Sequence, residues 1–250
     1  MKIIGISSGL SYNGYTANLV RVALQTVANQ GALVEEIFLP DYEVKLCKGC
    51  YGCLAKGKCG INDDLERLRQ KLHQADGIII GTQAFGSEPD PGMQNFLNRI
   101  GCSNQFTGSL SDKYLLAIAT SETFGPQHAA KKLTRLTSDF FKGGFISGVL
   151  GLDVSWDQIE QYPDYLGRIE HFGIKLFSDI RQKRRFQMNG TFERLSNRLF
   201  LVPQVKKTVL AQKNGKMEAV YQKLSVKGWL GDSPLKTSRA NINSTATVQS

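Results

Sequence analysis

The sequence predicts an α/β fold: a doubly wound, five-stranded parallel sheet with a basic helical extension at its C-terminus. Two observations support this prediction. Short apolar runs alternate with amphipathic helical segments through the first two-thirds of the 250-residue chain, and uninterrupted apolar runs are typical of strands buried on both faces. Five such strands within residues 1–185 fit the strand order 2-1-3-4-5, which places ligand-binding loops at the carboxyl ends of the strands.

The predicted elements follow from these patterns in chain order. The strands are the apolar runs at residues 2–6 (KIIGI), 33–39, 77–81 (GIIIG), 114–119 (YLLAIA) and 145–154. A helix is expected at 16–30, because Leu19, Val20, Ala23, Leu24 and Val27 recur at helical spacing. Further helices are expected from Asp63-Asp64 to about residue 74, at 91–100 with Pro91 in the first turn where proline is tolerated, at 127–141 and at 164–185.

We predict three parts along the chain. Residues 1–185 form the sheet domain, with a cysteine-rich loop at 47–59 inserted after the second strand. Residues 186–230 form the basic extension, with helices within 191–223 broken near Pro203 and Asn214-Gly215, and with Gly228-Trp229-Leu230 docked on the body. The tail at 231–250 is polar and rich in Ser, Thr and Asn, so we expect it to be disordered.

Composition and charge narrow the class of protein. Hydrophobic residues make up 41% of the chain, no apolar run approaches the roughly 20 residues of a membrane span, and the N-terminus lacks the apolar region of a signal peptide. We therefore expect a cytoplasmic protein without a transmembrane segment. Residues 168–227 hold 14 Lys or Arg against 4 Asp or Glu, which we interpret as a solvated helix face. No nucleic-acid partner is expected.

Four cysteines lie within thirteen residues: Cys47, Cys50, Cys53 and Cys59, with the spacing C-x2-C-x2-C-x5-C. Packing alone does not explain this cluster, whereas compact C-x2-C-x2-C runs are typical of iron–sulfur ligation. Zinc is the competing metal, although four-cysteine zinc sites usually pair two separated C-x2-C halves. A reduced loop without metal, or one holding a disulfide, remains an alternative. We expect Cys102 to be a core thiol.

The loop after the first strand is the first candidate ligand site. It runs from Ser7 to Thr16, is rich in hydroxyl groups and glycine, and ends at a helix N-terminus, which favours a phosphate. It contains no Lys or Arg and matches neither the Walker A nor the GxGxxG pattern. It therefore suits a phosphate monoester held by neutral donors, as in FMN; the alternative is an ordinary turn that caps the helix. The candidate residues are Ser7, Ser11, Asn13, Gly14, Tyr15 and Thr16.

The loops after the third and fourth strands are expected beside the first, since parallel strands end at the same edge of a sheet. Phe85 and Phe124 are candidates to pack against a flat ring, although core packing is expected for one of them. The small residues of these loops allow a ligand to approach the backbone closely. The candidate residues are Thr82, Gln83, Ala84, Phe85 and Gly86 in one loop, and Thr120, Ser121, Phe124 and Gly125 in the other.

Several motifs resemble those of the NAD(P)H-dependent FMN reductases of the flavodoxin-like fold, and specifically the iron–sulfur flavoproteins. The stretch Gly5–Thr16 (GISSGLSYNGYT) is similar to the family's phosphate loop, with the family's Pro and Arg replaced by Leu10 and Ser11. The cysteine run followed by Asp63-Asp64 is the most specific match. The stretches GIIIGTQAFGS and FLNR also resemble family elements, and the similarity covers residues 1–185.

This resemblance implies an FMN-dependent oxidoreductase or electron-transfer protein. It implies a [4Fe–4S] cluster on Cys47, Cys50, Cys53 and Cys59, NAD(P)H or a ferredoxin-like protein as electron donor, a small-molecule or protein redox partner such as a quinone or a flavin, and a homodimer or tetramer. We expect the flavin to perform the chemistry without a catalytic side chain. The alternatives are a metal-free NAD(P)H:FMN or quinone reductase, a non-catalytic electron carrier, and a zinc-stabilised interaction module.

Overall fold

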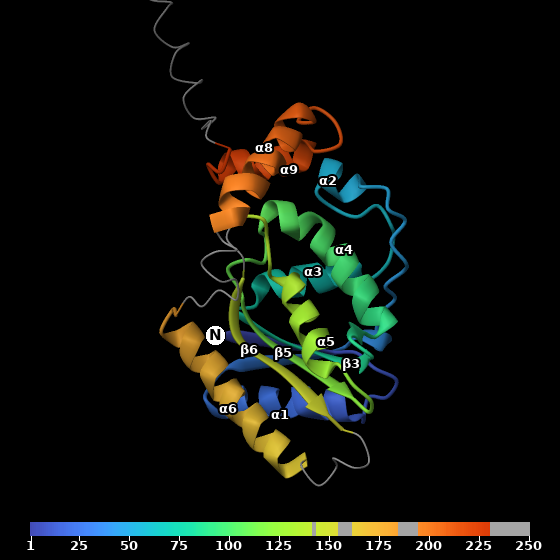
Figure 1. Cartoon of the computed structure of the whole chain (residues 1–250), viewed down its shortest axis with the longest axis vertical. Helices are drawn as coiled ribbons and strands as arrows, with labels where there is room; N and C mark the ends of the chain where they lie inside the picture. The colour runs from blue at the N-terminus through green and yellow to red at the C-terminus, as the bar shows by residue number, and fades with distance from the viewer. Residues whose placement is uncertain (142–143, 155–161, 185–194, 231–250) are drawn as a thin grey trace, which may run out of the picture.

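The sheet has the predicted topology. The computed structural model describes residues 1–141, 144–154, 162–184 and 195–230. Five strands lie parallel in the order β2-β1-β3-β5-β6, and the two-residue β4 pairs antiparallel with β3 (Figure 1). This arrangement confirms the predicted flavodoxin-like, doubly wound fold. The strands are β1 (Lys2–Ser7), β2 (Leu33–Phe38), β3 (Gly77–Phe85), β4 (Glu88–Pro89), β5 (Tyr114–Ser121) and β6 (Phe145–Asp153).

Helices cover both faces of the sheet. On one face α1 (Tyr15–Asn29) packs beside α6 (Tyr162–Arg181), and on the other lie α3 (Leu65–Gln74), α4 (Pro91–Thr107) and α5 (Pro126–Leu133) (Figure 1). Each face has its own apolar core, and β5 is buried along its whole length. A central strand that is apolar on both sides therefore produces the uninterrupted run seen in the sequence.

The strand register brings the candidate loops to one edge of the sheet. Ser7, the last residue of β1, is paired with Gly81 of β3, and Gln83 is paired with Thr120 of β5. The chain then continues from β1 directly toward α1. The loops after β1, β3 and β5 consequently start from neighbouring positions at the carboxyl edge.

The prediction of a single helix at 127–141 is wrong. The α-helix ends at Leu133 and a 3-10 turn follows over Thr134–Leu136. The hydroxyl of Thr134 donates to the carbonyl of Lys131 at 2.7 Å, and the side-chain amide of Asn104 donates to the carbonyls of Leu136 and Ser138. The carbonyls of Lys131, Leu136 and Ser138 therefore accept from side chains. Such side-chain hydrogen bonds compete with the backbone hydrogen bonds that would continue the helix.

Strand β3 and helix α4 extend well beyond their predicted ends. Strand β3 continues to Phe85, and α4 continues to Thr107, where Gly108 ends the helix in the left-handed conformation at φ 54°. Asp90 caps α4 by accepting from the amide of Met93 at 3.0 Å. The extra turns of α4 carry Cys102, which is half-buried and not part of the central core.

The extension packs on the outer end of α4. A π-helical turn (Asn197–Leu201) runs into α8 (Val202–Ala211) without a break at Pro203, contrary to the prediction, whereas the expected break at Asn214-Gly215 separates α8 from α9 (Glu218–Val226). A separate apolar cluster joins these helices to the short α2 (Gly52–Lys56) of the cysteine loop. Its buried members are Leu54, Val205, Val209, Met217, Val220, Leu224 and Leu230.

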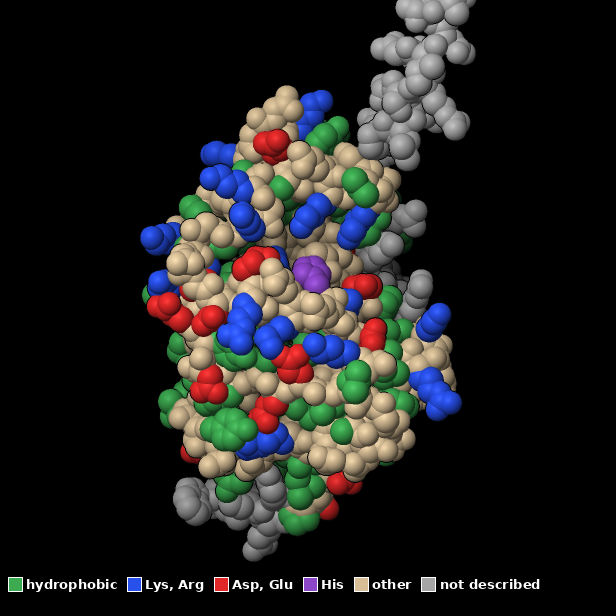
Figure 2. Space-filling model, turned by 180° about the vertical axis from the view of Figure 1, so that it is seen from behind, with side chains coloured by type: hydrophobic (Ala, Val, Ile, Leu, Met, Phe, Trp, Pro, Cys, Tyr) green, Lys and Arg blue, Asp and Glu red, His purple; other side chains and the backbone are tan. Residues whose placement is uncertain are grey.

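The segment at Trp229 docks on the body as expected. The centroids of the Trp229 and Phe141 rings are 4.8 Å apart. The ammonium of Lys227 lies over the Trp229 ring, 4.5 Å from its centroid. Lys and Arg side chains are frequent over the upper part of the face shown in Figure 2, where the extension lies. Among the described residues, no helix is long and apolar enough to cross a membrane. The predictions for 185–194 and for the tail at 231–250 lie outside the described residues.

Candidate functional site

A cavity of about 290 Å³ opens at the carboxyl edge of the sheet, where the loops after β1, β3 and β5 meet. It lies at the start of α1, so residues from the ends of β3 and β5 and from the N-terminus of α1 line it. Seven of the predicted residues line this cavity: Ser11, Gly14, Tyr15, Thr16, Gln83, Thr120 and Ser121. Sequence reasoning missed Ser8, Gly9, Leu10, Glu122 and Val154, which also line it.

The start of α1 is shaped by the loop before it. The amide of Gly14 donates to the carbonyl of Ser11 at 3.1 Å, and the amide of Asn13 donates to the hydroxyl of Ser11 at 3.2 Å. Gly14 caps the helix without a side-chain hydrogen bond, and the first turn carries no acidic residue. The first amides of a helix have no carbonyl partner within it and favour an anion. The cavity therefore has an anion-binding end.

Hydroxyl groups join the helix start to the neighbouring strand. The hydroxyls of Thr16 and Thr120, two residues that line the cavity, are hydrogen-bonded at 2.6 Å. Ser8 donates to the buried carboxylate of Asp90, which also accepts from Thr82 at 2.7 Å. Asp90, the cap of α4, thus joins the first loop to Thr82 of β3. Glu122 is the one acidic residue among those that line the cavity.

The loops after β3 and β5 touch each other beside this cavity. Gly86 and Gly125 have φ values of 62° and 79°, and a Cβ at Gly125 would lie 2.7 Å from the carbonyl oxygen of Gly86. Only glycine permits both this conformation and this approach. The hydroxyl of Ser121 accepts from the amide of Thr123 and donates to the carbonyl of Phe124, which stabilises the second loop.

Both candidate aromatic residues are exposed. Phe85 is 52% and Phe124 68% accessible, so the expectation that one of them packs in the core is wrong. Phe85 is the last residue of β3 and Phe124 lies in the loop after β5, so both lie outside the two apolar cores of the sheet. Of the remaining predicted residues, Ser7, Thr82 and Ala84 are buried, and Asn13, Gly86 and Gly125 lie in the loops next to the cavity without lining it. The buried hydroxyl of Ser7 has no hydrogen-bond partner among the described residues.

The arrangement fits FMN. A cavity with several hydroxyl side chains in its lining lies at the helix N-terminus, and large apolar side chains are exposed in the adjoining loops: Leu10, Tyr12, Phe85 and Phe124. The hydroxyls and the amides of the first turn of α1 suit a phosphate and a polyol chain, whereas exposed aromatic side chains suit a flat ring.

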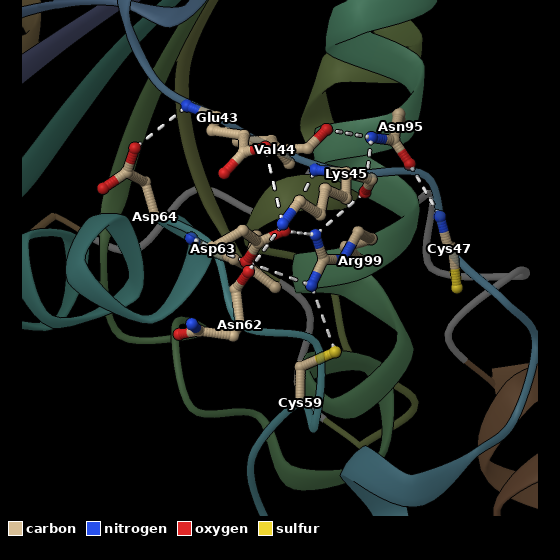
Figure 3. Close-up of polar contacts among 11 residues, drawn as sticks. Glu43, Val44, Lys45, Cys47, Cys59, Asn62, Asp63, Asp64, Asn95 and Arg99 are labelled. Atoms are coloured by element: carbon tan, nitrogen blue, oxygen red, sulfur yellow. Dashed lines mark hydrogen bonds and ion pairs between the residues drawn. The ribbon is translucent and has the colours of Figure 1, made fainter.

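The cysteine loop is anchored at both ends by α4 (Figure 3). Arg99 forms a fully buried ion pair with Asp63, and its guanidinium also donates to the carbonyl of Lys45 at 2.9 Å and to the Sγ of Cys59 at 3.1 Å. Asn95 accepts from the amide of Cys47 at 3.2 Å. One helix therefore positions the first and the last cysteine of the loop.

The four cysteines do not converge. Cys47 and Cys50 are exposed, Cys59 contacts Arg99, and the Sγ of Cys53 lies 3.6 Å from the Sγ of Cys102. In the part of the chain that the structure describes, no three His, Cys, Asp or Glu side chains are grouped to hold a metal ion. The donor chemistry suits an iron–sulfur cluster, but the arrangement of the sulfurs does not fit one without movement of the loop.

The two thiols in contact have unlike proton affinities. The hydrogen bond with Cys102 lowers the pKa of Cys53 to about 6, and the positive charge of Arg69 acts in the same direction. The same contact and burial raise the pKa of Cys102. Cys102 is half-buried beside the outer apolar cluster and not in the core as predicted, because α4 turns it toward Cys53 of the cysteine loop.

Comparison with known proteins identifies related sequences. The sequence profile of the NADPH-dependent FMN reductases matches residues 1–157. An iron–sulfur flavoprotein of Methanocaldococcus jannaschii is 44% identical over 85 residues, which are 34% of this chain and 44% of that protein. An iron–sulfur flavoprotein of Archaeoglobus fulgidus is 28% identical over 175 residues, covering 64% of this chain and 86% of that protein. The first match thus spans less than half of its relative.

Solved structures share the fold at low identity. A flavone reductase superposes with a TM-score of 0.59 at 18% identity, covering 75% of this chain and 66% of that chain. RosB, solved with the bound intermediate 8-demethyl-8-formylriboflavin-5'-phosphate, superposes with a TM-score of 0.57 at 14% identity, covering 82% of this chain and 87% of that chain. These similarities support the fold alone. The profile match covers more than half of the chain, and the chain therefore belongs to the family of the NADPH-dependent FMN reductases.

Proposed function

We propose that this protein is an FMN-dependent oxidoreductase that binds FMN at the carboxyl edge of its sheet. The observation that carries the proposal is the hydroxyl-lined cavity at the N-terminus of α1, beside the exposed Phe85 and Phe124. Family membership supports the choice of flavin.

The residues have distinct proposed roles. The first amides of α1, with Ser11 and Thr16, hold the phosphate without a cationic side chain. Gln83 and Thr120 line the path of the polyol chain, and the loops joined at Gly86 and Gly125 support the ring. The bound flavin supplies hydride and electron transfer, with NAD(P)H proposed as donor and a quinone, a flavin or a redox protein as acceptor.

The cysteine loop is proposed to hold a [4Fe–4S] cluster on Cys47, Cys50, Cys53 and Cys59. The compact spacing supports this proposal, and so do the names of the relatives, which are iron–sulfur flavoproteins. Loading requires Cys53 to turn away from Cys102. The alternative, a metal-free reductase, differs only in this loop, so the metal content of the purified protein distinguishes it from a cluster-containing protein.

The first experiment is an anaerobic absorption spectrum with iron and zinc analysis of the same sample, followed by NADH and NADPH oxidation assays. Flavin bands with about four irons per chain and rapid NAD(P)H oxidation support the full proposal. Flavin without iron supports the metal-free reductase, and flavin without NAD(P)H oxidation supports an electron carrier. A sample that binds no FMN after reconstitution contradicts the proposed function.

The position of the phosphate is tested by Ser11→Asp, which places a carboxylate in the cavity. Repulsion between like charges a few ångströms apart is worth about 1–4 kcal/mol, so we expect FMN affinity to fall at least tenfold while riboflavin affinity changes much less. The matched control is Gln25→Glu, which adds the same charge on an exposed position of α1. Equal losses for FMN and riboflavin would place the phosphate elsewhere.

A further inference from the structure

Cys53 and Cys102 form a close thiol pair from distant parts of the sequence. Their sulfurs are 3.6 Å apart, although 49 residues separate them in the chain. Cys53 is carried by α2 and Cys102 by α4, and both contact the apolar cluster that joins these helices to α8 and α9. The packing of these helices therefore brings the two thiols together, and the hydrogen bond between the sulfurs adds to this contact.

The geometry singles out this pair among the five cysteines. A disulfide has an S–S length of about 2.05 Å, so the two sulfurs must approach by about 1.5 Å, which side-chain rotation with a small shift of the short α2 can supply. Cys59 is held by the guanidinium of Arg99, and Cys47 is tied to Asn95 through its amide. Cys50 is exposed and is the nearest competitor along the chain.

We propose that Cys53 and Cys102 form a reversible disulfide and that this bond removes Cys53 from the cysteine loop's metal-ligand set. The second part rests on the proposed iron–sulfur function. Each thiol loses one proton and one electron as the Sγ–Sγ bond forms. A small-molecule disulfide such as glutathione disulfide accepts the two electrons and two protons and becomes two thiols. The oxidised chain then has three loop thiols, one fewer than a four-thiolate cluster requires.

The bond is tested on the full-length, metal-free protein. The protein is treated with glutathione disulfide, the remaining thiols are alkylated, and trypsin digestion is done without reductant. Cleavage after Lys48, Lys56, Arg99 and Lys113 yields peptides 49–56 and 100–113. We expect these two peptides to be linked, with fragmentation placing the bond at Cys53 and reductant releasing it.

Two variants make the test specific. Cys102→Ser removes the linked peptide, whereas the matched control Cys50→Ser retains it. A bond from Cys50 to either Cys53 or Cys102, or the absence of any link between the two peptides, would overturn the proposal.

The consequence for metal binding has a separate readout. Ferrous iron and sulfide are supplied anaerobically to oxidised and reduced protein, after removal of excess oxidant. We expect oxidised wild type to take up at least tenfold less iron than reduced wild type, and Cys102→Ser to take up the same amount after either treatment. Equal uptake by both forms of wild type would contradict the blocking role. If reduced wild type also takes up no iron, the cluster proposal fails, whereas a linked peptide still establishes the disulfide.

Discussion

Arg99 is the residue on which the cysteine loop depends most directly. Its side chain is 1% accessible, as is that of its ion-pair partner Asp63. Burial alone raises the pKa of Asp63, but Arg99 and the amides of Leu65 and Lys45 outweigh this effect, so the pKa lies below its ordinary value. The carboxylate is thus stabilised in its charged form in the folded protein, and it orients the guanidinium that reaches Cys59.

Asp63→Asn tests this arrangement. Removing one partner of a buried ion pair leaves the other charge uncompensated, which typically costs about 3–5 kcal/mol, so we expect a loss of this order in the free energy of unfolding. Denaturant titration measures it. The matched control is Glu88→Gln, whose ion pair with Lys132 is exposed and should be worth about 1 kcal/mol or less. Equal effects of the two substitutions would show that the buried pair has no special role.

At the level of elements, the short α2 depends on the extension. It is five residues long, too short to be stable alone, and its Leu54 is buried in the cluster with residues of α8 and α9. The extension therefore holds Cys53 in place as well as covering α4.

Leu224→Ala tests this dependence. Leu224 is fully buried in the cluster, and truncating such a leucine costs about 2–5 kcal/mol. We expect lower stability together with faster alkylation of Cys53 in the reduced, metal-free protein, measured by mass spectrometry. Val226→Ala is the control, since Val226 is 83% accessible. Its substitution should change the free energy of unfolding by no more than about 0.5 kcal/mol. Unchanged alkylation in Leu224→Ala would mean that α2 is held by α4 alone.

For the whole molecule, two chemical regions lie in different parts of the fold. The hydroxyl-lined cavity lies at the carboxyl edge, whereas the cysteine loop is anchored along α4 on one face. The expected cytoplasmic location and the expected homodimer or tetramer stay predictions.

Binding of FMN should stabilise the whole fold. A ligand that binds only the folded state at 100 times its Kd contributes about 2.7 kcal/mol, so thermal unfolding should shift upward as FMN is added. The shift should shrink in Ser11→Asp at the same FMN concentration and persist in Gln25→Glu. No shift in wild type would contradict binding at this edge.

The sequence by itself determined the strand–helix alternation, because burial on both faces of a parallel sheet demands apolar runs that are visible locally. It also pointed to the loops after β1, β3 and β5, because the topology fixes which strand ends are neighbours. Only the tertiary structure decided that Val154 reaches the cavity, that the helix from Pro126 stops at Leu133, and that Cys53 faces Cys102. These outcomes depend on contacts between distant elements, which local patterns do not encode.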